Sequence, residues 1–166
     1  MSVSRPVVVV AVVFAAVGGA ALAVDAGLLT PSQYDRATVT LADEDGQTLA
    51  TVEVRVADTF QKRYTGLSET ASLDEGEGML FVHDRAGSYA YVMRDMAFGL
   101  DIVFVAPNGT VTTIHHAERP PSGTTGDDLR RYRGYGVFVL EVPYGFTNRT
   151  GVTVGDEVSV SGLDDS

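Results

Sequence analysis

The sequence predicts an α+β domain that is mainly antiparallel β: a small barrel-like sheet of about eight short strands with one or two short helices, preceded by one N-terminal hydrophobic helix. Two observations indicate this fold class. Short runs of β-branched and aromatic residues recur along the chain, and each run is bounded by Gly, Pro or Asp. In several runs apolar and polar residues alternate, as they do in a strand with one buried face.

Eight segments carry this strand pattern. Residues 48–57 show it most clearly, because Val52, Val54 and Val56 alternate with polar residues. This run and residues 37–42 flank a Gly-containing turn, which predicts a β-hairpin. The expected strands are residues 37–42, 48–57, 79–83, 88–94, 100–106, 110–117, 137–142 and 157–162.

Residues 58–67 change to helical spacing. Phe60 and Tyr64 are four residues apart, and Asp58 with Gln61 has the spacing of a capping box. We therefore expect a short helix here, capped by Asp58 and ending at the next glycine.

Residues 118–136 form a loop that is too long for a simple connection in a compact domain, so it is either mobile or functional. It contains a dense basic cluster in which Arg131 and Tyr132 are candidate ligand-binding residues. Arg supplies forked donors and Tyr a stacking face, which suits an anionic or carbohydrate ligand; the alternative is a solvated or salt-bridged loop. Residues 143–156 are expected to contain one irregular helical turn.

The N-terminal segment is expected to lie in a membrane. Residues 6–24 contain no charged side chain, and as a helix rising about 1.5 Å per residue they span roughly 28 Å, close to the hydrocarbon thickness of a bilayer. A buried core helix is disfavoured because no side of this segment is polar. The segment is either a retained signal-anchor, which we favour, or a signal that is cleaved near Ala23 and leaves a secreted domain.

The charge beside this segment predicts its orientation. Arg5 precedes the apolar run, so the domain that follows is expected to be extracytoplasmic. The sequons at Asn108 and Asn148 are then candidate glycosylation sites. The chain is expected to divide into a signal-anchor (1–29), a tether (30–36) and a single β-rich domain (37–166).

The charge balance is strongly acidic. There are 22 acidic and 12 basic residues, and a single one of the basic residues, Lys62, is a lysine. An acidic surface repels phosphate backbones, so no nucleic-acid partner is expected. Acidic surfaces poor in lysine suit very salty solvent, so a halophilic source is expected, and most carboxylates are then solvation groups rather than catalytic ones.

Neither a metal nor a cofactor is expected. The absence of cysteine excludes disulfides, thiolate zinc sites, iron–sulfur clusters and a catalytic thiol. His115 and His116 are adjacent on an expected strand, so they point to opposite faces and do not easily bind one metal ion. No phosphate-binding loop or catalytic triad is recognisable, and no catalytic residue is assigned.

Four charged residues within or beside apolar runs are candidate ligand-binding residues: Arg94, Asp95, Asp101 and Glu141. Asp101 and Glu141 stand in segments with the pattern of buried strands, where an unpaired carboxylate costs several kcal/mol. Arg94 is the nearest candidate partner of Asp101 in the sequence. Three interpretations stay open: a structural Arg–carboxylate clamp, a ligand pocket, or an acid/base pair.

A set of dispersed motifs resembles one known family. They are Gly66-Leu67, Gly78-Met79-Leu80-Phe81, Met93-Arg94-Asp95-Met96, Leu100-Asp101-Ile102-Val103-Phe104-Val105, Val139-Leu140-Glu141, Gly145 and Gly155-Asp156. Over about residues 50–162 the chain resembles the family of domains of unknown function 192, as a haloarchaeal-type member. The resemblance implies a compact β-rich extracytoplasmic domain behind a signal or anchor, and it implies no known activity.

The chain departs from the family pattern at two places. Members usually read Trp-Met-Lys-Asn-Thr where this chain has Val92 to Met96, and Pro-Leu-Asp where it has Gly99 to Asp101. The function expected from the sequence is a non-catalytic binding or accessory module of the cell envelope, anchored in the membrane or exported. The alternatives are a small envelope-acting hydrolase or lyase that uses Asp101 or Glu141, and a structural partner of a membrane complex.

Overall fold

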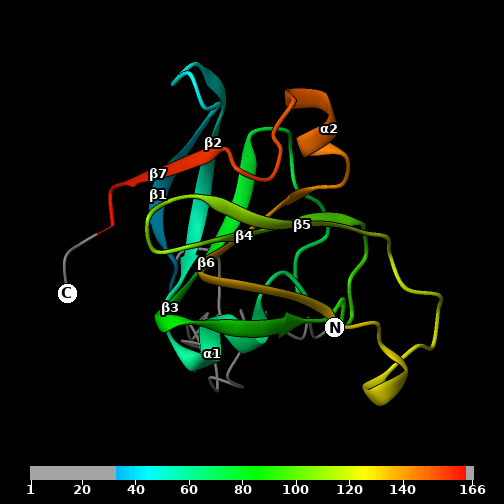
Figure 1. The fold of residues 1–166 in the computed structure, drawn as a ribbon. Helices are drawn as coiled ribbons and strands as arrows, with labels where there is room; N and C mark the ends of the chain where they lie inside the picture. Colours follow the sequence, from blue (N-terminus) through cyan, green and yellow to red (C-terminus); the bar gives the residue numbers. More distant parts are fainter. Residues whose placement is uncertain (1–32, 164–166) are drawn as a thin grey trace, which may run out of the picture.

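The computed structural model describes residues 33–163, which form a strongly curved sheet of seven strands with two short α-helices (Figure 1). The strands are β1 (Asp35–Ala42), β2 (Thr48–Ala57), β3 (Glu77–Tyr91), β4 (Leu100–Val105), β5 (Val111–Ala117), β6 (Tyr132–Pro143) and β7 (Glu157–Ser161). The helices are α1 (Phe60–Thr65) and α2 (Phe146–Thr150), with a 3₁₀ turn, η2, at Gly126–Asp128. The mainly antiparallel β fold with short helices is therefore confirmed.

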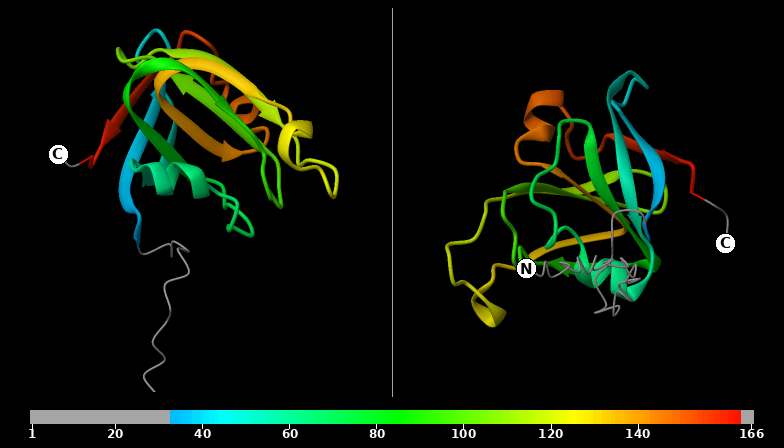
Figure 2. Two further views of the ribbon diagram at one scale, coloured as in Figure 1. Left: turned by 90° about the horizontal axis from the view of Figure 1, so that it is seen from below. Right: turned by 180° about the vertical axis from the view of Figure 1, so that it is seen from behind.

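The strand order in the sheet is β5-β4-β6-β3-β2-β1-β7. Neighbouring strands are antiparallel except β2 and β3, which run parallel and are joined by a crossover that contains α1. A parallel pair cannot be joined by a tight turn, so this crossover has to pass over one face of the sheet. Figures 1 and 2 show α1 lying across the end of the sheet at which β1 begins.

The sheet curls into a half-barrel because its two edges approach each other. Thr110, before β5, forms an isolated antiparallel bridge with Glu157 at the start of β7. Backbone hydrogen bonds extend this contact: Val111 N donates to the Asp156 carbonyl at 2.9 Å, and Val158 N donates to the Gly109 carbonyl at 2.7 Å. The barrel-like closure that the short strands predict is therefore partial: the edge strands β5 and β7 meet where both begin.

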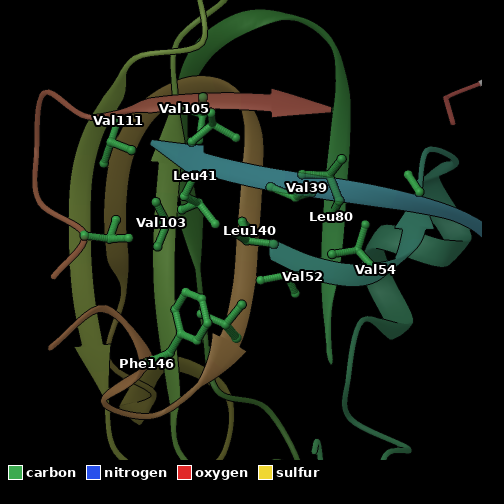
Figure 3. Close-up of a cluster of buried hydrophobic side chains, with 14 of the residues drawn as sticks. Val39, Leu41, Val52, Val54, Leu80, Val103, Val105, Val111, Leu140 and Phe146 are labelled. Atoms are coloured by element: carbon green, nitrogen blue, oxygen red, sulfur yellow. The ribbon is translucent and has the colours of Figure 1, made fainter. Parts of the chain in front are cut away.

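Each face of the curved sheet carries its own buried apolar cluster. Alternation along the strands divides the residues: in β4, Val103 and Val105 pack into the inner cluster, whereas Ile102 and Phe104 pack into the outer one. Figure 3 shows the inner cluster. Leu41 of β1 is one of its side chains, and Phe146 of α2 adds an aromatic ring. The outer cluster is covered by the crossover, by the loop after β3 and by the second half of β3 itself.

Two expected strands, residues 79–83 and 88–94, are one continuous strand, so the described sheet has seven strands rather than eight. The ladder between β3 and β6 is irregular between Val82 and Gly87, but the strand continues to Tyr91. The expected loop 118–136 is correspondingly too long, because β6 already begins at Tyr132, which pairs with Tyr91.

Helix α1 exists as expected, but its N-cap is not Asp58. The cap is Thr59, whose Oγ1 accepts a hydrogen bond from Lys62 N at 3.2 Å, while the Asp58 carboxylate lies 2.9 Å from Lys62 Nζ. A hydroxyl can cap as well as a carboxylate, so sequence spacing alone does not choose between neighbours. The helix ends at Gly66, with φ of 51°.

The expected N-terminal hydrophobic helix falls in residues 1–29, outside the described residues. Within residues 33–163, the helices are too short to reach across a bilayer.

Candidate functional site

Glu141 is a buried acid near the end of β6. The strand register pairs it with Met79 of β3 and Ile102 of β4, and paired residues point to the same side of a sheet. Both partners belong to the outer apolar cluster, so the Glu141 side chain enters that cluster too, and it is only 5% exposed. A carboxyl group is thus placed among apolar side chains on the face that α1 covers.

A cavity of about 300 Å³ opens between α1 and this part of the sheet, and Glu141 lines it. The volume is at the lower end of the range typical of small-ligand pockets. Helix α1 and the turn after it form one wall, and Phe81, His83 and Tyr91 of β3 form the other. The loop after β3 contributes Arg94. The pocket is therefore mostly apolar and aromatic, with a few polar groups.

The Glu141 carboxyl has no hydrogen-bond partner among residues 33–163. Burial raises its pKa to about 8, because the ionised form loses its hydration without gaining a compensating donor. At neutral pH the group is protonated, so it can donate one hydrogen bond and accept others. An unpartnered acid beside an open cavity is a group that a ligand can satisfy.

His83 and Tyr91 line the same pocket as neutral groups. Burial lowers the pKa of His83 to about 4, with a smaller contribution from the nearby charge of Arg63. Burial also raises the pKa of Tyr91, and the charge of Glu141 adds to this effect. The ring nitrogen His83 Nε2 and the hydroxyl of Tyr91 are 2.9 Å apart, so the two side chains fix each other's position in the wall.

Arg94 lies at the mouth of the pocket. Its guanidinium is 3.9 Å from the ring centroid of Tyr64 and donates a hydrogen bond to the Tyr64 carbonyl, so it is held against α1. Within the described part of the chain it forms no salt bridge with a carboxylate. It therefore offers positive charge and unused donors to an anionic group at the entrance.

Asp101 does not reach this pocket. It lies on the opposite face of β4 from Ile102 and is 0% exposed. Its Oδ1 accepts hydrogen bonds from His116 Nδ1 at 2.8 Å and Gly145 N at 3.0 Å. Its Oδ2 accepts from Thr147 N at 2.9 Å and Thr147 Oγ1 at 2.7 Å. These bonds hold the start of α2 and strand β5 to β4, which is the work of a structural clamp.

Asp101 does brace the fold, but the Arg–carboxylate clamp expected from the sequence is not formed, because no arginine contacts this carboxylate. Arg94 pairs with Tyr64, and the donors to Asp101 come from His116, from Gly145 before α2 and from Thr147 within α2. Because Asp101 and Glu141 point to opposite faces of the sheet, they do not form an acid/base pair. Of the four candidates, the structure brings Arg94 and Glu141 together in one pocket and places Asp101 elsewhere.

Asp95 is exposed and has a left-handed backbone, with φ of 55°. Asn and Asp tolerate this conformation better than other non-glycine residues. The Asn that the family pattern has at this position therefore has a backbone explanation, and Asp95 satisfies the same requirement.

The two candidate residues from the basic cluster, Arg131 and Tyr132, lie in different environments. Arg131 is exposed and forms a salt bridge with Asp127 at 3.2 Å, whereas Tyr132 is buried at the start of β6. Tyr132 and Arg130 line a second cavity of about 390 Å³ beneath the 118–131 loop, and Arg131 does not. Within residues 33–163 no group of three His, Asp or Glu side chains is placed to hold a metal ion.

The two candidate glycosylation sites, Asn108 and Asn148, are both exposed. Asn108 lies in the turn between β4 and β5, and Asn148 lies on α2. Their accessibility agrees with the sequons, whose use stays a prediction.

Sequence reasoning does not identify His83 and Tyr91 as pocket residues. Their juxtaposition depends on the bend between the two halves of β3, which brings positions 83 and 91 within hydrogen-bonding distance. One feature of the sequence could have indicated an aromatic surface here. Tyr89 and Tyr91 are two residues apart, and alternate residues of a strand share a face of the sheet.

The fold and the pocket define a small β-rich domain with a buried acid in an aromatic cavity. Residues 40–160 match the family DUF192, described as Uncharacterized ACR, and the chain belongs to this family. No curated protein matches the chain.

Two solved structures are similar to it. A crystal structure of a proposed transcription regulator from Sinorhizobium meliloti 1021 has a TM-score of 0.68 and 29% identity, covering 78% of this chain and 97% of that one. A protein of unknown function from Novosphingobium aromaticivorans DSM 12444 has a TM-score of 0.66 and 27% identity, covering 80% and 91%. Both likenesses extend over nearly the whole of the other chain, so they concern the entire fold rather than one motif.

Proposed function

We propose that this chain is a non-catalytic binding module of the cell envelope, held at the membrane by residues 6–24, and that the cavity between α1 and β3 is its ligand pocket. One observation carries the proposal: Glu141 is buried at the cavity wall and has no hydrogen-bond partner from residues 33–163. Stability alone does not explain such a group, because an apolar residue of similar size would avoid the desolvation cost.

The chemistry of the pocket favours an anionic or carbohydrate ligand. Protonated Glu141 does not repel an anion and can donate a hydrogen bond to its oxygen, while Arg94 supplies positive charge at the mouth. Tyr91 and Phe81 give the apolar surface against which a sugar ring or a short aliphatic body packs. The acidic charge of the whole chain disfavours a nucleic-acid partner for it.

Calorimetry on the full chain in mild detergent tests this proposal. The panel consists of neutral sugars, uronic acids, sugar phosphates and inorganic phosphate. We expect one class to bind the wild type, and we expect Glu141→Leu to lose that binding while Glu157→Gln, an exposed acid on β7, retains it. Binding should weaken above about pH 8, where Glu141 ionises and repels an anion. Equal affinity in Glu141→Leu and wild type would refute the pocket assignment.

A second candidate function is general acid catalysis by Glu141 alone. A carboxyl group whose pKa is raised to about 8 is protonated at neutral pH, as a general acid must be. The two-carboxylate mechanism is not available, since Asp101 faces the other way. Product analysis with the ligand class that binds decides between the two: turnover that Glu141→Gln abolishes without loss of binding identifies an enzyme, and binding without turnover identifies a binding module.

A further inference from the structure

Helix α1 carries two large aromatic side chains that face solvent. Phe60 is 79% exposed and Tyr64 is 61% exposed, and their rings stack with centroids 6.2 Å apart. Adjacent exposed aromatics on one helical face are unusual in a soluble domain, because each ring has a large apolar area to bury. This pair, which we term the α1 aromatic face, also lines the mouth of the Glu141 pocket.

The α1 aromatic face lies where the chain enters the domain. Lys62 of α1 is 3.2 Å from the Asp35 carboxylate at the start of β1, and its ammonium lies 6.0 Å from the ring centroid of Tyr34. The described chain therefore begins beside α1, as Figure 2 shows from two sides. Eight residues, 25–32, separate this point from the uncharged segment 6–24, and at about 3.5 Å per residue they reach at most about 28 Å.

A cation accompanies the aromatic rings. The guanidinium of Arg94 lies over the Tyr64 ring at 3.9 Å, without a salt bridge to any carboxylate of residues 33–163. Tyrosine, phenylalanine and arginine together match the boundary layer of a bilayer, where rings sit at headgroup depth and cations meet phosphates. The chain as a whole is acidic, and the two acids that lie beside α1, Asp35 and Asp58, are both paired with Lys62.

We propose that the α1 aromatic face rests on the lipid surface, so that the mouth of the Glu141 pocket opens toward the headgroup layer. The inference rests on the proposed anchor in residues 6–24, which holds α1 within reach of the bilayer. It gives the pocket a source of ligand: a headgroup or another amphipathic molecule at the interface enters without crossing open solvent.

Single-tryptophan variants test the contact, because the natural chain contains no Trp. Full-length Phe60→Trp and Tyr144→Trp are each reconstituted in vesicles of phosphatidylcholine and phosphatidylglycerol, with and without bromine on the acyl chains. Tyr144 is the matched control, because it is also an exposed aromatic but precedes α2, at the end of the domain away from α1 (Figure 1). Vesicle flotation is measured on the same samples.

We expect brominated lipid to quench the tryptophan fluorescence of the Phe60→Trp variant, with a shift of its emission to shorter wavelength, and to leave the control unchanged. Flotation without quenching in Phe60→Trp overturns the docking and leaves the anchor standing. If the emission of Phe60→Trp shifts to shorter wavelength but bromine does not quench it, the docking on lipid is overturned. In that case a second copy of the protein covers the α1 aromatic face. Loss of flotation overturns the anchor, and with it the docking that rests on it.

Discussion

Asp101→Asn removes the charge from a fully buried side chain that accepts four hydrogen bonds. An Asn side chain has the same shape but one acceptor oxygen, so its NH₂ group must face either the donors of Oδ1 or those of Oδ2. In the first position the N–H of Gly145 loses its acceptor, and in the second the N–H of Thr147 does. His116 and the Thr147 hydroxyl can adapt by exchanging or rotating a proton, but a backbone N–H cannot.

The loss of stability in Asp101→Asn can be estimated from these hydrogen bonds. One buried backbone N–H left without a partner costs about 1–3 kcal/mol, and the two remaining bonds lose the extra strength of a charged acceptor, about 1 kcal/mol each. We therefore expect Asp101→Asn to lower the free energy of unfolding by about 3–5 kcal/mol. For a domain of this size that corresponds to a fall in Tm of roughly 10–20 °C.

Thermal unfolding of the full chain in mild detergent, followed by far-UV circular dichroism, measures this change. Asp127→Asn is the matched control, because Asp127 is fully exposed in the 118–131 loop, and its substitution should leave the Tm unchanged. If Asp101→Asn unfolds within about 2 °C of the wild type, the clamp does not stabilise the fold and the argument from unsatisfied donors is wrong.

Three further predictions concern the outer face and the loop after β3. Glu141 keeps its proton in the folded state up to about pH 8 but loses it near 4.5 when unfolded, so the folded state binds more protons in this window and Glu141 lowers stability as pH rises. The loss approaches about 5 kcal/mol, and urea titrations should show it as the difference between wild type and Glu141→Gln, because His83, whose pKa is lowered to about 4, makes both proteins more stable as pH rises to about 6.5. Gly134→Ala should cost about 2–3 kcal/mol in the same assay, because a Cβ there would lie 2.3 Å from the Phe104 ring, whereas Gly87→Ala meets only ordinary contacts and should be tolerated. Asp95→Gly should raise stability by about 1 kcal/mol and Asp95→Val should lower it by at least as much, since φ is positive there; equal Tm values for the two variants would contradict the backbone argument.

Local pattern is sufficient to predict most of the strands. Residues 48–57 alternate cleanly, and β2 occupies that range because one face of the strand packs on the core. The pattern fails where the pairing is long-range. The segment around Tyr132 is rich in Arg and Gly and resembles a loop, yet it forms the start of β6 because the second half of β3 provides a partner ladder. The local propensity of this segment gives no indication that the second half of β3 pairs with it.

The candidate site likewise contains features that local sequence predicts and features that depend on long-range contacts. Burial of Asp101 follows from its apolar neighbours, and the need for hydrogen bonds follows from burial. The donors could not be predicted, because two of them are backbone N–H groups 44 and 46 residues further along the chain, and backbone groups leave no mark in a sequence. Arg94 is near Asp101 in the sequence, but this says little about proximity across a sheet. That Glu141 faces a cavity depends on the path of the crossover over the outer face.

The single parallel pair in the described sheet has a consequence for how relatives of this chain can diverge. Because β2 and β3 run in the same direction, the polypeptide is obliged to travel over the sheet between them, and residues 58–76 both complete that route and build one wall of the Glu141 pocket. Under the proposed function, insertions or exchanges in this stretch would alter what the pocket accepts while every strand ladder stays intact. Selectivity and architecture are thereby separable, and a chimaera that swaps only this stretch between two homologues should transfer ligand preference without loss of folding.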